Sequence, residues 1–234
     1  MLGIVAALRS EARILGSLPL TASGLVQLSP STLLYIAGMG AKQAQVASEV
    51  LIGENASALL SWGSAGALHS KLSPGNLIVP KIVIYPQKAL FSTDDGWHNR
   101  LLTRLANQLE VFTEPLAQSL TVLKSRAEKL DFVKQTQALA VDMESGSVAK
   151  AARKANLPFM AIRAIADPLE QTIPASALRA INQSGRFRPF HLLGNLARRP
   201  ADFLILNQLR RNFIAARKTL SIVAQLLGKD FLAF

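Results

Sequence analysis

Residues 138–168 read ALAVDMESGSVAKAARKANLPFMAIRAIADP, a pattern typical of a strand, a helix and a second strand. The apolar run at 138–141 predicts the first strand, and the run at 159–166, apolar apart from Arg163, predicts the second. Small and apolar residues recur at helical spacing between them, and the helix should end before Pro158. Because such a crossover is right-handed, we expect the two strands to be parallel neighbours in one sheet.

Acidic residues follow both predicted strands. Asp142 and Glu144 come just after the first, and Asp167 comes just after the second. In open α/β sheets, ligands bind at the carboxyl edge of the strands. Alone, Glu144 could merely favour a helix N-terminus, and Asp167 could merely begin a turn. Because both fall at one edge, with Arg163 in the second strand, the pattern predicts a functional site.

The composition fits one large α/β domain. The chain has 234 residues, of which 50% are hydrophobic, and this is enough for one sizeable core. It has no cysteine, which excludes disulfides, thiol nucleophiles and thiolate metal ligands. His69, His98 and His191 lack ligand spacing, so we expect no metal. The apolar N-terminus favours a strand over a signal peptide, and no uncharged apolar run approaches the ~20 residues that span a bilayer.

The positive charge is concentrated near the C-terminus. Residues 186–234 carry nine basic and two acidic residues, which gives +7 of the formal net charge of +11. We expect a basic helical extension of the single domain over about 186–234. Its apolar residues recur at alternating three- and four-residue spacing, as on one face of a helix: Leu206, Leu209, Phe213, Ala216, Leu220, Val223 and Leu227. This stripe could pack on the domain or on another subunit. Alternatively, it could contact an anionic membrane surface, helped by Arg210, Arg211, Arg217 and Lys218.

Two apolar runs near the N-terminus also predict strands. The run at 3–8 leads into a helix with Glu11 in its first turn, where a carboxylate commonly only favours the helix dipole. The run at 32–37 ends in the turn 38–40, which contains two glycines. Amides in such a turn could approach an anion, but a plain tight turn is the simpler interpretation.

A third apolar run, at 58–62, is followed by Gly63-Ser64-Ala65-Gly66. We interpret this as a turn of small residues around one hydroxyl, against which a phosphate, a water or a ribose hydroxyl could lie. Residues 85–137 predict a helix at 125–134 but no defensible chemistry.

These segments together resemble a known family. In order, they read GIVAALRSEARIL, IAGMGAKQAQVASEVLI, SWGSAGAL, AVDMESGSVAKAA and RAIAD. In that order and spacing they resemble the purine nucleoside phosphorylase and nucleosidase superfamily, and in particular the methylthioadenosine and adenosylhomocysteine nucleosidases, over about residues 1–170. The resemblance implies a three-layer αβα fold with a mixed central sheet.

The resemblance also implies roles for individual residues. Glu11 would activate the attacking nucleophile, with Ser64 and Gly63 beside it. Met143 and Glu144 would hold the ribose, and Asp167 would face purine N7 as the acid. These types suit cleavage of an N-glycosidic bond, which builds positive charge on the ribose and negative charge on the base.

The chain departs from the family pattern at several positions. Arg9 and Ser10 precede Glu11 where nucleosidases carry glutamates, and Ala166 replaces the serine before the catalytic aspartate. Asp142, counted here with the substrate-binding residues, shortens the first acid of its motif. The phosphate-binding arginine of hexameric phosphorylases is replaced by Ser61, which favours water over phosphate. Arg9 or Arg163 could instead bind inorganic phosphate, so it stays open as a co-substrate; we expect no other cofactor.

The segment after residue 170 resembles the hopanoid-associated phosphorylase branch, through a Gly-Arg turn, a short helix, an Arg-Arg-Pro break and a basic final helix. This implies removal of adenine from adenosylhopane, by phosphorolysis or hydrolysis. The superfamily builds its sites near subunit contacts, which implies a homodimer. From the basic tail we expect a cytoplasmic protein with peripheral contact at the inner face of the membrane. Two alternatives are a soluble nucleosidase or phosphorylase, and a non-catalytic nucleoside-binding adaptor at a membrane. We expect no nucleic-acid binding, because the basic tail lacks an aromatic stacking platform and a reading motif.

Overall fold

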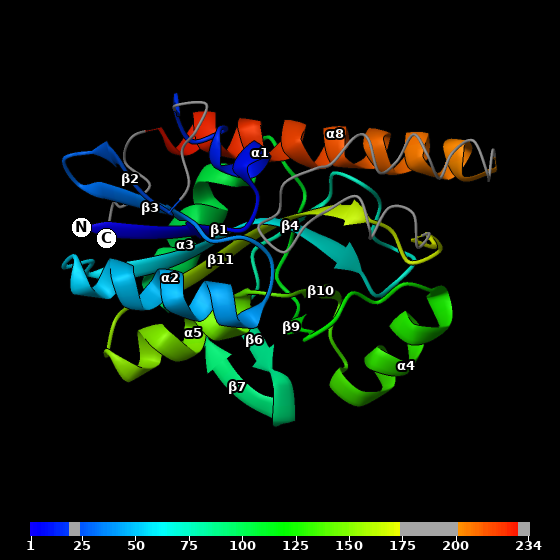
Figure 1. Cartoon of the computed structure of the whole chain (residues 1–234), viewed down its shortest axis with the longest axis horizontal. Coiled ribbons are helices and arrows are strands. Elements are labelled where there is room, and N and C mark those ends of the chain that lie inside the picture. Colours follow the sequence, from blue (N-terminus) through cyan, green and yellow to red (C-terminus); the bar gives the residue numbers. More distant parts are fainter. Residues whose placement is uncertain (19–23, 174–200, 229–234) are drawn as a thin grey trace.

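The computed structural model describes residues 1–18, 24–173 and 201–228, and Figure 1 shows their arrangement. The strands are β1 Leu2–Ala6, β2 Gly24–Ser29, β3 Thr32–Ile36, β4 Ala58–Ala67, β5 Leu77–Ile78, β6 Ile82–Tyr85, β7 Ala89–Ser92, β8 Val111–Phe112, β9 Leu116–Gln118, β10 Ala140–Asp142 and β11 Phe159–Asp167. The helices are α1 Arg9–Ala12, α2 Ala41–Gly53, the 3₁₀ turn η1 Pro86–Lys88, α3 Asp95–Leu105, α4 Arg126–Thr136, α5 Ser145–Lys154 and α8 Ala201–Leu227.

The strands form one mixed sheet. Its main path runs β2-β3-β1-β4-β10-β9-β6-β7, while β11 pairs with β4 and β5, and β5 also pairs with β8. The centre is parallel, since β1 pairs in parallel with β3 and β4, and β4 pairs in parallel with β11. The pairs β2–β3, β6–β7, β5–β11 and β4–β10 are antiparallel.

Helices cover both faces of the sheet (Figure 1). Because side chains alternate along a strand, Leu60 and Met160 pack with α3 and α8, whereas Leu59 and Ala161 pack with α2 and α5. The two apolar clusters form the core on either side of the sheet. This confirms the predicted three-layer α/β fold with a mixed central sheet.

The predicted pairing of the strands around residues 138–168 is wrong. β10 and β11 are not parallel neighbours, because both pair with β4, β10 antiparallel to it and β11 parallel to it. β4 is longer than predicted: the Gly63–Gly66 segment continues the strand rather than forming a turn. Val141 of β10 and Asp167 of β11 are both in register with Gly66. The two acidic strand ends therefore converge on the end of β4.

The C-terminal helix packs on the domain. Leu209, Ala216, Leu220, Val223 and Leu227 are buried, most of them in the same cluster as residues of β11. The apolar stripe therefore belongs to the core, and the expectation that this stripe faces a lipid surface is wrong.

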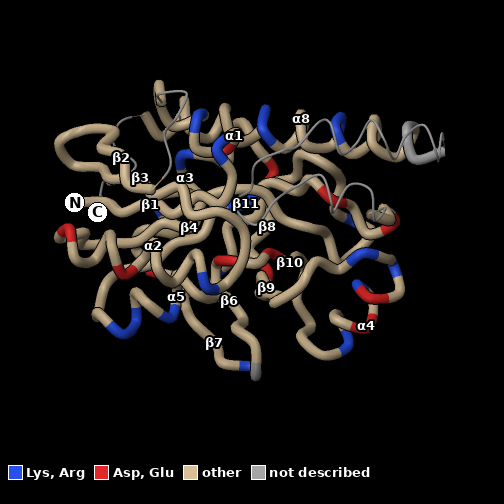
Figure 2. The backbone as a smooth tube through the Cα atoms, in the orientation of Figure 1, with Lys and Arg blue, Asp and Glu red and all other residues tan. Residues whose placement is uncertain are grey.

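The same helix also carries exposed basic residues: Arg210, Arg211, Arg217 and Lys218. Figure 2 marks basic positions along α8 in blue. The predicted Gly-Arg turn and Arg-Arg-Pro break, within residues 185–200, lie outside the described residues. Within the described parts of the chain, no helix has the length and hydropathy of a membrane span.

Candidate active site

A cavity of about 210 Å³ opens where β4, β10 and β11 end beside α1. It brings together nearly all the residues predicted for the site, which are far apart in sequence. Its lining includes Glu11, Ser64, Asp142, Met143, Glu144, Arg163 and Asp167.

Arg163 is the centre of a buried ionic network. Its side chain is 1% exposed, its Nε lies 2.8 Å from Asp142 Oδ2, and its Nη2 lies 3.9 Å from Glu144 Oε2. The guanidinium also donates to Ser61 Oγ, at 2.6 Å, and to Ser145 Oγ. Ser145 Oγ donates in turn to Asp142. Protein groups thus hold the arginine rigidly. The participation of Ser61 and Ser145 in this network was not predicted from the sequence.

Glu11 is buried and held by three donors. Its Oε1 accepts from the Ser64 amide at 2.9 Å and from Ser64 Oγ at 2.6 Å, and its Oε2 accepts from the Leu8 amide at 3.2 Å. Burial raises the pKa of Glu11, while the Ser64 hydrogen bonds and the charge of Arg163 oppose that rise. Glu11 therefore does more than favour a helix dipole.

Gly63 lets Glu11 and Arg163 approach each other. A Cβ at this position would lie 2.5 Å from Arg163 Nη1 and 2.8 Å from Glu11 Oε2, and the backbone φ is +153°. Gly63 was predicted as a substrate-binding residue. The structure explains the glycine by packing instead, because a side chain at this position would separate Glu11 from Arg163.

Glu144 is buried and accepts a hydrogen bond from the Gly40 amide at 2.7 Å. Burial and the neighbouring charge of Asp142 raise the pKa of Glu144 to about 7, against the opposing effects of Arg163 and the Gly40 amide. The simpler interpretation of residues 38–40 as a plain turn was therefore incomplete, because one of its amides binds a carboxylate.

Asp167 has a different ionic partner from the acids of this network. Its Oδ2 is 2.9 Å from Lys129 Nζ, and its Oδ1 is buried without a hydrogen-bond partner among the described residues. Burial raises the pKa of Asp167, and the ammonium of Lys129 opposes the rise. Sequence reasoning missed Lys129, because a lysine on a helix is usually a solvated residue.

Apolar side chains complete the cavity wall. They come from the segments after β1, β3, β9 and β11, from β10 and from α8: Leu8, Met39, Val122, Leu123, Val141, Ile173, Leu209 and Phe213. A ligand in this cavity therefore meets acidic groups on one side and hydrocarbon on the other, the combination that suits a small molecule with polar and apolar parts.

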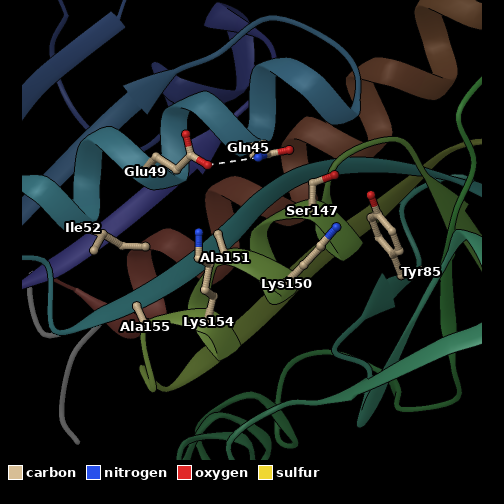
Figure 3. Close-up of a pocket in the computed structure, with 9 residues that line it drawn as sticks. All are labelled: Gln45, Glu49, Ile52, Tyr85, Ser147, Lys150, Ala151, Lys154 and Ala155. Atoms are coloured by element: carbon tan, nitrogen blue, oxygen red, sulfur yellow. Dashed lines mark hydrogen bonds between the residues drawn. The ribbon is translucent and has the colours of Figure 1, made fainter.

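A second cavity, of about 460 Å³, lies between α2 and α5 (Figure 3). Its lining includes Gln45, which donates to Glu49 at 2.9 Å, and Lys150, whose Nζ lies 5.1 Å from the centre of the Tyr85 ring. It contains none of the residues predicted for the site, and its one carboxylate, Glu49, has no second acid beside it in the cavity lining. We therefore place the chemistry in the first cavity.

The fold and the first cavity define an α/β protein with a small cavity among buried acidic groups at the ends of its central strands. The sequence profile of the family described as the Phosphorylase superfamily matches residues 28–186. The chain belongs to this superfamily, as its motifs predicted.

The chain is also 26% identical over 174 residues to a 5'-methylthioadenosine/S-adenosylhomocysteine nucleosidase of Buchnera aphidicola subsp. Baizongia pistaciae. That alignment covers 66% of this chain and 64% of the relative, so the chain matches just under two thirds of the relative's length.

Solved structures share the fold. The 5'-methylthioadenosine/S-adenosylhomocysteine nucleosidase of Neisseria meningitidis, in complex with methylthio-immucillin-A, superposes with a TM-score of 0.71 at 16% identity and covers 97% of both chains. Futalosine hydrolase of Helicobacter pylori superposes with a TM-score of 0.67 at 18% identity, covering 96% of this chain and 97% of its own.

Proposed function

We propose that this protein cleaves the N-ribosidic bond of an adenine nucleoside. The observation that carries the proposal is the single cavity lined by Glu11, Glu144 and Asp167, three carboxyl groups whose pKa values are raised by burial. Buried acids cost stability, and groups tuned in this way gather at catalytic sites. This argues against the alternative of a non-catalytic adaptor, which needs no such acids.

Each group has a place in the reaction. Asp167 gives a proton to purine N7, so that the base leaves neutral as the C–N bond breaks. Glu144 accepts from a ribose hydroxyl and stabilises the positive charge that develops on the sugar. Glu11, held by Ser64, accepts the proton of the attacking water, and the C–O bond forms at the anomeric carbon.

Water is the nucleophile that the charges of this site favour. Glu11, Asp142 and Glu144 surround a single guanidinium, which is already paired with Asp142 at 2.8 Å. A phosphate dianion would meet more negative than positive charge there. We therefore propose hydrolysis, with phosphorolysis as the outcome that a phosphate requirement would reveal.

The apolar cavity wall supports a substrate with an apolar 5' substituent. Leu209 and Phe213 reach this wall from α8, in the region that resembles the hopanoid-associated branch. On this basis we propose a lipid-linked adenosine, adenosylhopane, as the substrate. A soluble enzyme for methylthioadenosine or adenosylhomocysteine is the second candidate, favoured by the 26% identity to the Buchnera nucleosidase. We further propose a cytoplasmic homodimer that meets the inner face of the membrane through the exposed basic side of α8.

The decisive experiment incubates the protein with adenosine, methylthioadenosine and a lipid-linked adenosine, each with and without phosphate. Free adenine and the sugar product are followed by chromatography. Adenine release without phosphate, with kcat/KM highest on the lipid-linked substrate, supports the proposal. Higher kcat/KM on methylthioadenosine favours the second candidate, and a ribose 1-phosphate product would replace hydrolysis by phosphorolysis. Absence of base release from all three substrates would overturn the enzymatic proposal.

A further inference from the structure

A lysine is buried behind the carboxylate of Asp167. Lys129, on α4, has a fully buried side chain, and its Nζ lies 2.9 Å from Asp167 Oδ2. It also donates to the backbone oxygens of Pro168 at 2.8 Å and Gln171 at 3.1 Å. An ammonium has three donors, and here each has an acceptor. Lysine is rarely buried unless it is paired in this way.

The contacts of Lys129 leave the two oxygens of Asp167 in different states. Oδ2 is occupied by the ammonium, whereas Oδ1 is buried and has no partner among the described residues. A carboxyl proton on Oδ2 would oppose the ammonium, so a proton on Asp167 belongs on Oδ1. Oδ1 is thus the atom available to a base in the cavity.

We propose that Lys129 is a positioning residue for Asp167, which holds Oδ2 so that Oδ1 presents its proton to the leaving base. This rests on the proposed function, in which Asp167 is the acid. In the step, the O–H bond at Oδ1 breaks, the proton bonds to N7, and the glycosidic electron pair leaves with the base. The carboxylate that remains is paired with the ammonium of Lys129, which keeps its own protons throughout. Solvent reprotonates Asp167 after the base has left.

Two opposing effects act on this acid. Burial raises the pKa of Asp167, which favours its protonated form, and the charge of Lys129 limits that rise, which eases transfer to the base. The other charged groups that line the cavity are Glu11, Asp142, Glu144 and Arg163. Among the described residues, Lys129 is the one charged partner that forms an ion pair with Asp167.

The test compares Lys129→Met with Lys134→Met, a control on the same helix whose side chain is 76% exposed. Each variant is assayed on the adenine nucleoside that wild type cleaves and on 4-nitrophenyl riboside, whose leaving group needs no proton. We expect Lys129→Met to lower kcat on the adenine nucleoside at least ~10-fold, part of the ~100-fold or more that a positioned acid supplies. KM and turnover of the nitrophenyl riboside should stay close to wild type, and Lys134→Met should match wild type on both substrates.

Two further readouts separate positioning from a merely structural role. In the Asp167→Asn background, Lys129→Met should add little further loss, because the two residues act as one unit. The alkaline fall in kcat should move to higher pH in Lys129→Met, since the opposite charge beside the acid is gone. If Lys129→Met does not fold, Lys129→Gln, which keeps two donors but no charge, replaces it in all assays.

Equal losses on both substrates, or losses that add fully to those of Asp167→Asn, would overturn the positioning role while leaving the proposed function standing. A wild-type protein that releases base from no adenine nucleoside would overturn both.

Discussion

The buried acidic groups at the two ends of the cavity are paired in different ways. At one end, Arg163 pairs with Asp142 and Glu144 and donates to Ser61 and Ser145. The Gly40 amide donates to Glu144. At the other, Asp167 has one lysine and one oxygen left without a partner. The first arrangement is a closed network, and the second leaves an atom free to react. A satisfied network gives rigidity, whereas chemistry needs a group that is not fully satisfied.

Among the residues of the closed network, Arg163 should contribute most to the stability of the fold. Removing one partner of a buried ion pair leaves the other charge uncompensated, so Arg163→Met should lower the free energy of unfolding by about 3–5 kcal/mol. The control is Arg126→Met, which removes an exposed ion pair with Glu170 and should cost less than ~1 kcal/mol. Urea denaturation measures both. Equal costs for the two variants would mean that the network contributes no more than a surface pair.

At the other end of the cavity, beside Lys129, Asp167 should contribute most to base release. Asp167→Asn keeps the size of the side chain but cannot deliver a proton, so base release should fall at least ~100-fold while the fold stays intact. Turnover is measured on an adenine nucleoside, and circular dichroism reports the fold. Near-normal turnover on a substrate whose leaving group needs protonation would remove Asp167 from the acid role.

Glu144 links the closed network to the substrate. Glu144→Gln should lower kcat more than it raises KM, because the contact with a ribose hydroxyl strengthens as charge develops on the sugar. We expect a loss of at least ~10-fold in kcat from steady-state kinetics, a part of the stabilisation that such electrostatic groups supply. An unchanged kcat on ribonucleosides would place Glu144 outside the site.

Stability should also depend on the protonation of Glu144. Its pKa is raised from 4.5 to about 7, so the folded protein keeps a proton that the unfolded chain releases. The stability that this proton contributes is full below about pH 4.5 and is lost as the pH rises to about 7. The difference in unfolding free energy between wild type and Glu144→Gln should therefore fall across this window. A difference that rises with pH would contradict the raised pKa.

The smallest effect is expected far from both ends of the cavity, on the exposed side of α8. Changing Arg210, Arg211, Arg217 and Lys218 to Gln should leave turnover of soluble adenosine analogues unchanged, and each exposed change should alter stability by no more than ~0.5 kcal/mol. Each basic residue near an anionic surface adds about 1 kcal/mol, so binding to anionic vesicles should weaken in a co-sedimentation assay.

The control for this variant carries the same number of changes at exposed basic residues elsewhere: Lys42, Lys81, Arg100 and Arg104. It should bind vesicles as wild type does. If wild type ignores vesicles and the α8 variant dissociates into smaller oligomers in light scattering, this face of the helix is a subunit interface instead.

The order of motifs in the sequence was enough to predict the family, the three-layer fold and the charged residues that line the cavity. Local patterns carry this information, because strand and helix periods and the acidic residues that follow them depend on neighbours in the chain. The apolar stripe of the C-terminal helix was predicted for the same reason, because its residues recur at the helical period.

Contacts between segments that are distant in the chain could not be predicted from these local patterns. The placement of β4 between β10 and β11, the Gly40 amide at Glu144 and the burial of the α8 stripe against the sheet each depend on packing between segments far apart in the chain. Lys129 is the clearest case, because a lysine on a helix gives the same local signal whether it is solvated or buried. Only the tertiary structure places its ammonium against Asp167, where desolvation and the opposite charge change the chemistry of both groups.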